Sequence, residues 1–294
     1  MPNFPRLAGL ETLLQFDNWP ILVLGRVFDR KTGLVTYRKQ GLEILVDHRG
    51  GDENGTRACI VSPMYRRHLA GLALSGPLRV LDLGANGGGF PLMLRLAGFD
   101  IAQVVCVEMN RPTWLRLMIN LATNLNVNAI GLNAAVCGMP TGTEILLQPS
   151  RGSTSLSLNA QQTDASAPHI SVPTITLADL CAQYFQGSDI DICKIDIEGA
   201  EYDALDAAPD EVIRKIRNLI IEFHTPAKTP ACLSRLLRLG FSDSTGNGDA
   251  RTSETTEVRV FRRAETFRQT GEDMRGAPRS IAAAPANRNK SPAA

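Results

Sequence analysis

Acidic side chains and one histidine stand where two short apolar runs of the sequence end. The first run leads into Lys194–Glu201 (KIDIEGAE), and the second ends in Glu222–His224 (EFH). If both runs are neighbouring strands of one sheet, Asp196, Glu198 and His224 meet beyond the strands' carboxyl ends, where open α/β sheets bind ligands. Carboxylates and imidazoles can take a proton from an acceptor hydroxyl. These three are therefore our candidate catalytic residues.

The same cluster offers a second use, as a binding site for a divalent cation. Carboxylate oxygens suit hard cations, and a bound cation would lower the pKa of an acceptor hydroxyl. The candidate ligands are Asp196, Glu222 and His224. We favour general-base chemistry and keep the metal as the alternative.

A glycine-rich turn follows another apolar run, in the segment Val80–Phe90 (VLDLGANGGGF). A dinucleotide site would have G-x-G-x-x-G after the strand, with a pyrophosphate on the helix N-terminus. Here the spacing is G-x-x-G-G-G, and Asp82, expected at an exposed strand tip, would repel a pyrophosphate. A ligand with a cationic amine or sulfonium, such as S-adenosylmethionine, fits better. The predicted cofactor contacts in this segment are Asp82, Gly84, Ala85, Asn86 and Gly87.

Further positions complete a nucleoside site. Glu108 ends the next apolar run, 24 residues after Gly84, where an acid can accept both ribose hydroxyls. Asn133 and Ala135 close a third run, in which small side chains would leave space for an adenine ring. Asp196 would complete this set of cofactor contacts from its own strand end.

Strands alternating with helices must position these residues. The alternation predicts an α/β fold with a doubly wound, mostly parallel sheet over residues 63–264. Residues 1–62 predict a small β-rich extension, with strands at Ile21–Leu24, Leu34–Tyr37 and Leu42–Val46. Residues 265–294 contain few large apolar side chains, and we expect a disordered tail.

Composition narrows the class of protein. The 294 residues include 31 basic and 30 acidic side chains, a balance that gives no general attraction to nucleic acid or to an anionic membrane. No apolar run approaches the roughly 20 residues of a membrane span, and no signal peptide is visible. Six cysteines are scattered without a CxxC pair. We expect a cytoplasmic enzyme with no nucleic-acid partner.

The motifs also carry a family resemblance, strongest in Lys194–Glu201. Together with Asp82–Gly88, Glu108, Asn120 and Asn124, this segment resembles the FkbM family of S-adenosylmethionine-dependent methyltransferases. The resemblance implies a Rossmann-like class I methyltransferase sheet. It also implies S-adenosylmethionine as cofactor, and methyl transfer to a hydroxyl of a sugar, glycolipid or secondary metabolite.

Other interpretations remain open at this point. The acceptor would be a small molecule or a glycan, and residues 1–62 would shape its pocket or a homodimer contact. A catalytically silent cofactor-binding scaffold is the main alternative. A nicotinamide-dependent oxidoreductase is less consistent with Asp82.

Overall fold

The computed structural model describes residues 10–28, 33–70, 72, 74–147, 169–224, 226–245 and 256–263. All of these belong to one compact unit. The predicted disordered tail, residues 265–294, lies outside the described residues. None of the helices in the described ranges combines the length and the apolarity that a membrane crossing requires.

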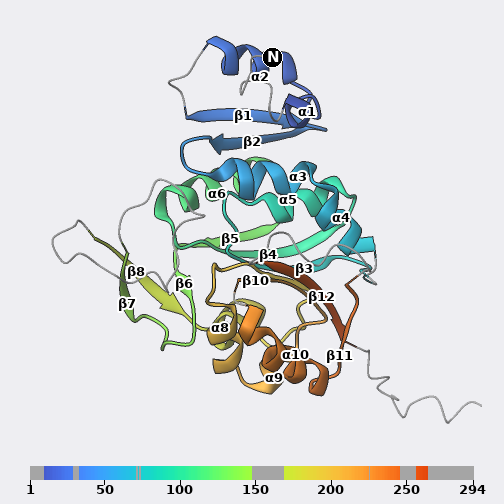
Figure 1. Ribbon diagram of the computed structural model, residues 1–294, viewed down its shortest axis with the longest axis vertical. Coiled ribbons are helices and arrows are strands. Elements are labelled where there is room, and N and C mark those ends of the chain that lie inside the picture. Colours follow the sequence, from blue (N-terminus) through green and yellow to red (C-terminus); the bar gives the residue numbers. More distant parts are fainter. Residues whose placement is uncertain are drawn as a thin grey trace, which may run out of the picture. The chain divides into compact units, whose positions relative to one another are not determined.

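A seven-stranded sheet forms the centre of the unit, in the order β11-β12-β10-β9-β3-β4-β5 (Figure 1). Five neighbouring strands are parallel, and β12 runs antiparallel to β10 and β11. The strands are β3 (Leu78–Leu83), β4 (Ile101–Val107), β5 (Asn128–Leu132), β9 (Ile192–Ile195), β10 (Asn218–Phe223), β11 (Phe241–Asp243) and β12 (Glu257–Arg263). The chain order reverses between β3 and β9, and ligands bind at such a switch point. The predicted doubly wound sheet is confirmed.

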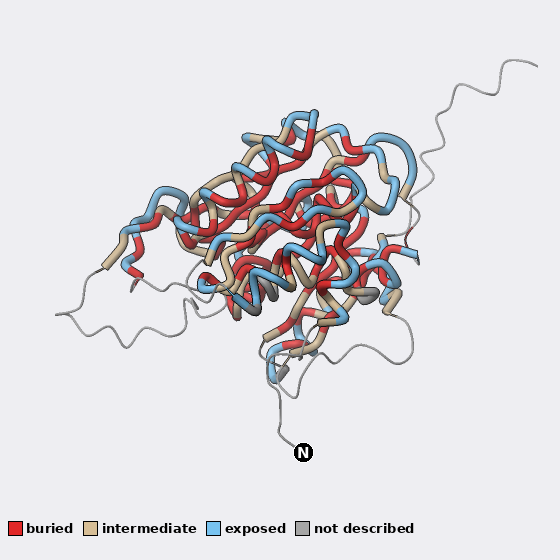
Figure 2. The backbone as a smooth tube through the Cα atoms, turned by 90° about the horizontal axis from the view of Figure 1, so that it is seen from above, coloured by how far each residue is buried: buried red, intermediate tan, exposed pale blue. Residues whose placement is uncertain are grey.

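Helices cover both faces of this sheet (Figure 1), and the buried residues are concentrated in the interior of the unit (Figure 2). Val80 and Leu81, neighbours in β3, are fully buried in different apolar clusters, as alternating side chains of a doubly covered strand must be. One face carries α5 (Gly89–Leu96) and α6 (Arg111–Asn124). The other carries α7 (Leu177–Leu180), α8 (Glu201–Ala207), α9 (Asp210–Ile213) and α10 (Thr229–Arg238), whose buried apolar residues join the cluster of Leu81. A second, three-stranded sheet consists of β6 (Ala135–Val136), β8 (Ile170–Ile175) and β7 (Glu144–Leu147), in that order.

The N-terminal segment differs in part from the prediction. The strands expected near residues 34 and 42 form the antiparallel hairpin of β1 (Leu34–Lys39) and β2 (Leu42–Asp47). The strand expected at Ile21–Leu24 is wrong, because these residues lie within the helix α2 (Trp19–Phe28). A short apolar run does not by itself distinguish a strand from a helix. Three more short elements are helical: α1 (Leu10–Leu13), α3 (Ala58–Val61) and α4 (Pro63–Ala70).

Two asparagines of α6 attach the hairpin to the sheet-covering layer. Asn120 pairs through its side-chain amide with the backbone N–H and C=O of Leu45, at 2.7 and 3.0 Å. Asn124 does the same with Glu43, at 2.8 and 2.7 Å. Four residues of a helix and two residues of a strand both span about 6 Å. The distance between the two asparagines on α6 therefore equals the distance between their partners on β2. The backbone N–H and C=O groups of Glu43 and Leu45, on the edge of β2, are thereby hydrogen-bonded.

Candidate active site

A pocket of about 280 Å³ opens at the carboxyl ends of β3, β4, β9 and β10. Its lining is strongly acidic, and Lys194 is the one cationic side chain among the described residues that line it. The five lining carboxylates are Asp82, Glu108, Asp196, Glu198 and Glu222. The pocket therefore lies at the switch point of the sheet and favours a ligand that carries positive charge.

The glycine turn forms one wall of this pocket. Gly84, Ala85 and Asn86 line it, whereas Gly87 does not. A side chain on Gly84 would overlap the backbone oxygen of Asp196, and one on Gly87 would overlap the Thr56 hydroxyl. The missing side chains therefore make room for neighbouring protein segments, while the backbone of the turn faces the ligand.

Asp82 lies deeper than the sequence indicates. It is fully buried rather than exposed at a strand tip, and it lies on a central strand with β4 and β9 on either side. Its nearest cation is the Lys194 ammonium, 3.6 Å from Oδ1, and neither carboxylate oxygen has a hydrogen-bond partner among the described residues. Burial raises the pKa of Asp82 to about 6, against the opposing effect of Lys194. Lys194 also lies 3.0 Å from Oδ2 of Asp196 and so links the two acids.

Glu108 lies beside the turn, as predicted. Its two oxygens accept backbone N–H bonds from Asn86 at 3.0 Å and from Asn110 at 2.7 Å. Burial nevertheless raises the pKa of its carboxyl to about 7. Asn133 does not line the pocket; its amide donates to the backbone oxygens of Glu108 and Met109 and so positions the end of β4. Ala135, with Ala134 and Val136, does line it.

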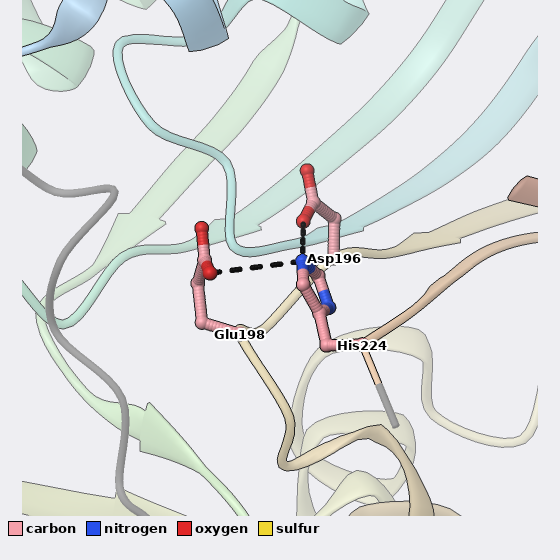
Figure 3. A group of neighbouring side chains, drawn as sticks. All are labelled: Asp196, Glu198 and His224. Carbon is pink, nitrogen blue, oxygen red and sulfur yellow. Dashed lines mark ion pairs between the residues drawn. The ribbon is translucent and has the colours of Figure 1, made fainter. Parts of the chain in front are cut away.

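His224 brings the catalytic candidates together (Figure 3). Its Nε2 lies 3.6 Å from Glu198 Oε2 and 3.9 Å from Asp196 Oδ1, and its Nδ1 lies 2.8 Å from Glu201 Oε1. Burial lowers the pKa of this ring, but the hydrogen bond to Glu201 and the surrounding carboxylates outweigh it and raise the pKa to about 9. At neutral pH the ring is an imidazolium, which cannot accept a further proton.

The ligand atoms of Asp196, Glu198 and His224 all lie within 4.8 Å of one another, close enough for a metal ion. We expected Glu222 as the third ligand of such an ion, but the group contains Glu198 in its place. Glu222 lines the pocket outside this group. A metal ion bound here would take the place of the proton on Nε2. The metal therefore stays the alternative to general-base chemistry at this cluster.

A wall of the pocket comes from a segment that sequence reasoning missed. Thr56, fully buried, donates a hydrogen bond to Asn86 Oδ1 at 2.8 Å and accepts one from the Gly87 N–H at 2.9 Å. It holds the segment from residue 55 to 65 against the glycine turn. The pocket-lining residues of this segment are Gly55, Ala58, Cys59, Ser62 and Tyr65. Their spacing of three to four residues signals a helix face but names no ligand.

The chain is similar to several solved methyltransferase structures. No curated protein matches the chain. Among solved structures, TrmK from M. capricolum in complex with S-adenosyl-homocysteine is 9% identical, with a TM-score of 0.42 and coverage of 69% of each chain. A putative RNA methyltransferase from Pyrococcus horikoshii is 12% identical, with a TM-score of 0.40 and coverage of 70% of this chain and 81% of its own. An rRNA methylase from Streptococcus thermophilus is 9% identical, with a TM-score of 0.41 and coverage of 69% and 98%.

The sequence itself matches a family over most of its length. The methyltransferase FkbM domain matches residues 82–268, from the acid that precedes the glycine turn to the residues beyond the last strand of the sheet. This range includes Lys194–Glu201 and His224. The chain therefore belongs to the FkbM methyltransferase family.

Proposed function

We propose that this methyltransferase uses S-adenosylmethionine and methylates a hydroxyl oxygen of a small molecule or glycan. The observation that carries the proposal is the acidic pocket at the switch point, where five carboxylates and one lysine line the described part of the wall. Carboxylates gathered around one pocket repel one another. A ligand that carries a positive charge would compensate that repulsion.

The residues around the pocket fit such a cofactor. Glu108 keeps lone pairs free beyond its two backbone bonds and would accept the ribose hydroxyls. Ala134, Ala135 and Val136 would border the adenine ring, and the turn at Gly84 to Asn86 would face the amino-acid portion. When bound, S-adenosylmethionine supplies an electrophilic methyl group.

Asp196 is the group we assign as general base. It lines the pocket, its side chain is 26% exposed, and Lys194 and His224 hold it from two sides. His224, as an imidazolium, would orient the carboxylates of Asp196 and Glu198 rather than accept the proton. Holding an acceptor oxygen in line with the bond to the methyl group can lower the activation barrier by roughly 7–11 kcal/mol.

Calorimetric titration and a methyl-transfer screen test the proposal together. S-adenosylhomocysteine should bind to the protein, and NAD should not. Neutral glycosides and small hydroxylated metabolites are then incubated with a labelled methyl donor, with and without EDTA. Binding with no product from any acceptor would favour the silent scaffold. NAD binding in place of S-adenosylhomocysteine would overturn the cofactor, and loss of product in EDTA would establish a metal requirement.

A further inference from the structure

Tyr65 stands out among the pocket residues that no family motif accounts for. It belongs to α4, which precedes the FkbM domain at residue 82, yet it lines the same pocket as Asp196. The residue is only 7% exposed, and its ring packs edge-on against Phe90 at a centroid distance of 5.9 Å. The ring is therefore fixed in place by the protein.

The hydroxyl of Tyr65 has no hydrogen-bond partner among the described residues. Buried tyrosines usually find one. Because its oxygen is not among the fully enclosed, unpartnered atoms, it reaches the open space of the pocket. A bound molecule is what would satisfy it.

The charges around the phenol indicate which part of the pocket it faces. Lys194, Asp196 and Glu222 are among the charged groups that act on it most strongly. Burial, the largest influence, raises the pKa of the phenol well above its usual value, so the hydroxyl remains a donor. The carboxylates of Asp196, Glu198 and Glu222 would repel an anionic acceptor from the same region.

We propose that the Tyr65 hydroxyl donates a hydrogen bond to a neutral, polyhydroxylated acceptor on the Asp196 side of the pocket. This assignment rests on the proposed function. Tyr65 would be a specificity-determining residue supplied by the N-terminal segment, and the hydrogen bond would help to orient the acceptor oxygen toward Asp196.

The test compares Tyr65→Phe with the wild type and with Tyr184→Phe, a control whose ring is outside the pocket lining. Tyr65→Phe keeps the packing on Phe90 and removes one hydroxyl. The readouts are S-adenosylhomocysteine affinity and labelled methyl transfer to a set of neutral methyl glycosides. We expect unchanged affinity and a roughly fivefold to tenfold lower kcat/KM for the methylated glycosides in Tyr65→Phe alone.

A second measurement does not depend on turnover. The chain has only four tyrosines, so 3-fluorotyrosine labelling gives four ¹⁹F signals, which Phe variants assign. With S-adenosylhomocysteine already bound, added glycoside should shift the Tyr65 signal and leave that of Tyr184 in place.

The outcomes separate this assignment from the proposed function. Weaker S-adenosylhomocysteine binding in Tyr65→Phe would place Tyr65 in the cofactor site and overturn the assignment while leaving the cofactor intact. Equal kinetics in all three proteins, or neither a Tyr65 shift nor product across the glycosides, would also overturn it. Failure of the wild type to bind S-adenosylhomocysteine would instead overturn the proposed function.

Discussion

His224 Nδ1 and Glu201 Oε1 lie 2.8 Å apart, and Glu201 is fully buried. The same oxygen accepts the backbone N–H groups of Ile197 at 3.1 Å and Gly199 at 3.0 Å. Between them Glu198 adopts a left-handed conformation with φ 54°. One carboxylate therefore holds both the imidazolium and the turn that presents Glu198.

Glu201→Gln should lower the pKa of His224 from about 9 toward its ordinary value of 6.5. The substitution keeps an oxygen at the acceptor position but removes the charge that favours the protonated ring. An NMR titration of the imidazole C–H signals measures this, with the other three histidines as internal references. An unchanged titration of His224 would show that Glu201 does not set its protonation.

Asp196→Asn should retain cofactor affinity and lose methyl transfer. An amide cannot take the acceptor's proton, and loss of a general base typically costs about 10²–10⁴-fold in rate. Asp189→Asn, at an exposed ion pair with Arg217, is the matched control. Full turnover in Asp196→Asn with an identified acceptor would remove Asp196 from the mechanism.

Asp82→Asn and Asp82→Ala should differ in stability. Both should bind S-adenosylmethionine at least about tenfold more weakly, equivalent to about 1.4 kcal/mol. Asn keeps the volume of the buried side chain, and Lys194 retains Asp196 at 3.0 Å, so this variant should fold. Ala also leaves a cavity in β3 and should lower the unfolding midpoint further. Wild-type affinity in a folded Asp82→Asn protein would contradict the cofactor assignment.

The ligand-free protein should lose stability as the pH rises from about 4.5 to 7. Burial raises the pKa of Glu108 and of Glu222 from 4.5 to about 7, so the folded state binds these protons more tightly than the unfolded state does. The free energy of unfolding then falls with pH across that interval. Glu108→Gln should flatten this dependence in urea titrations, whereas the exposed Glu211→Gln should not. Equal slopes in both variants would refute the raised pKa of Glu108.

Thr56→Val should weaken both the fold and the cofactor site. The change preserves shape but leaves Asn86 without the hydroxyl that holds it, at a cost of about 1–3 kcal/mol. Urea unfolding gives the stability, and calorimetry gives the affinity for S-adenosylhomocysteine. If affinity stays at the wild-type value despite the lower stability, the segment from residue 55 to 65 does not shape the cofactor site.

Sequence patterns predicted the sheet and the polar strand ends well, because both are local. Asp82, Glu108 and Asp196 each lie at or next to the end of an apolar run, and parallel strands bring such ends to one edge. What the pattern could not supply were contacts between distant segments. Asp82 lies on a central strand between β4 and β9, and Tyr65 follows a segment that Thr56 attaches to the glycine turn.

The N-terminal segment is a second case in which the local sequence did not determine the structure. Ile21–Leu24 is apolar and β-branched at its start, which favours a strand locally, but it lies in α2. The edge of β2 is hydrogen-bonded by the side chains of Asn120 and Asn124 rather than by residues 21–24. Both asparagines contribute to the family resemblance, yet their role could be understood only once the hairpin was in place.

The close approach of β3 and β9 at Gly84 also limits how this site can diversify. Any larger residue there would have to separate the two central strands, and φ is +73° as well. Gly98 and Gly142 share a positive φ but have open space around them, so asparagine could replace either at modest cost. A side chain at position 84 would therefore change the spacing of the two central strands next to the pocket, whereas one at position 98 or 142 would leave that spacing unchanged.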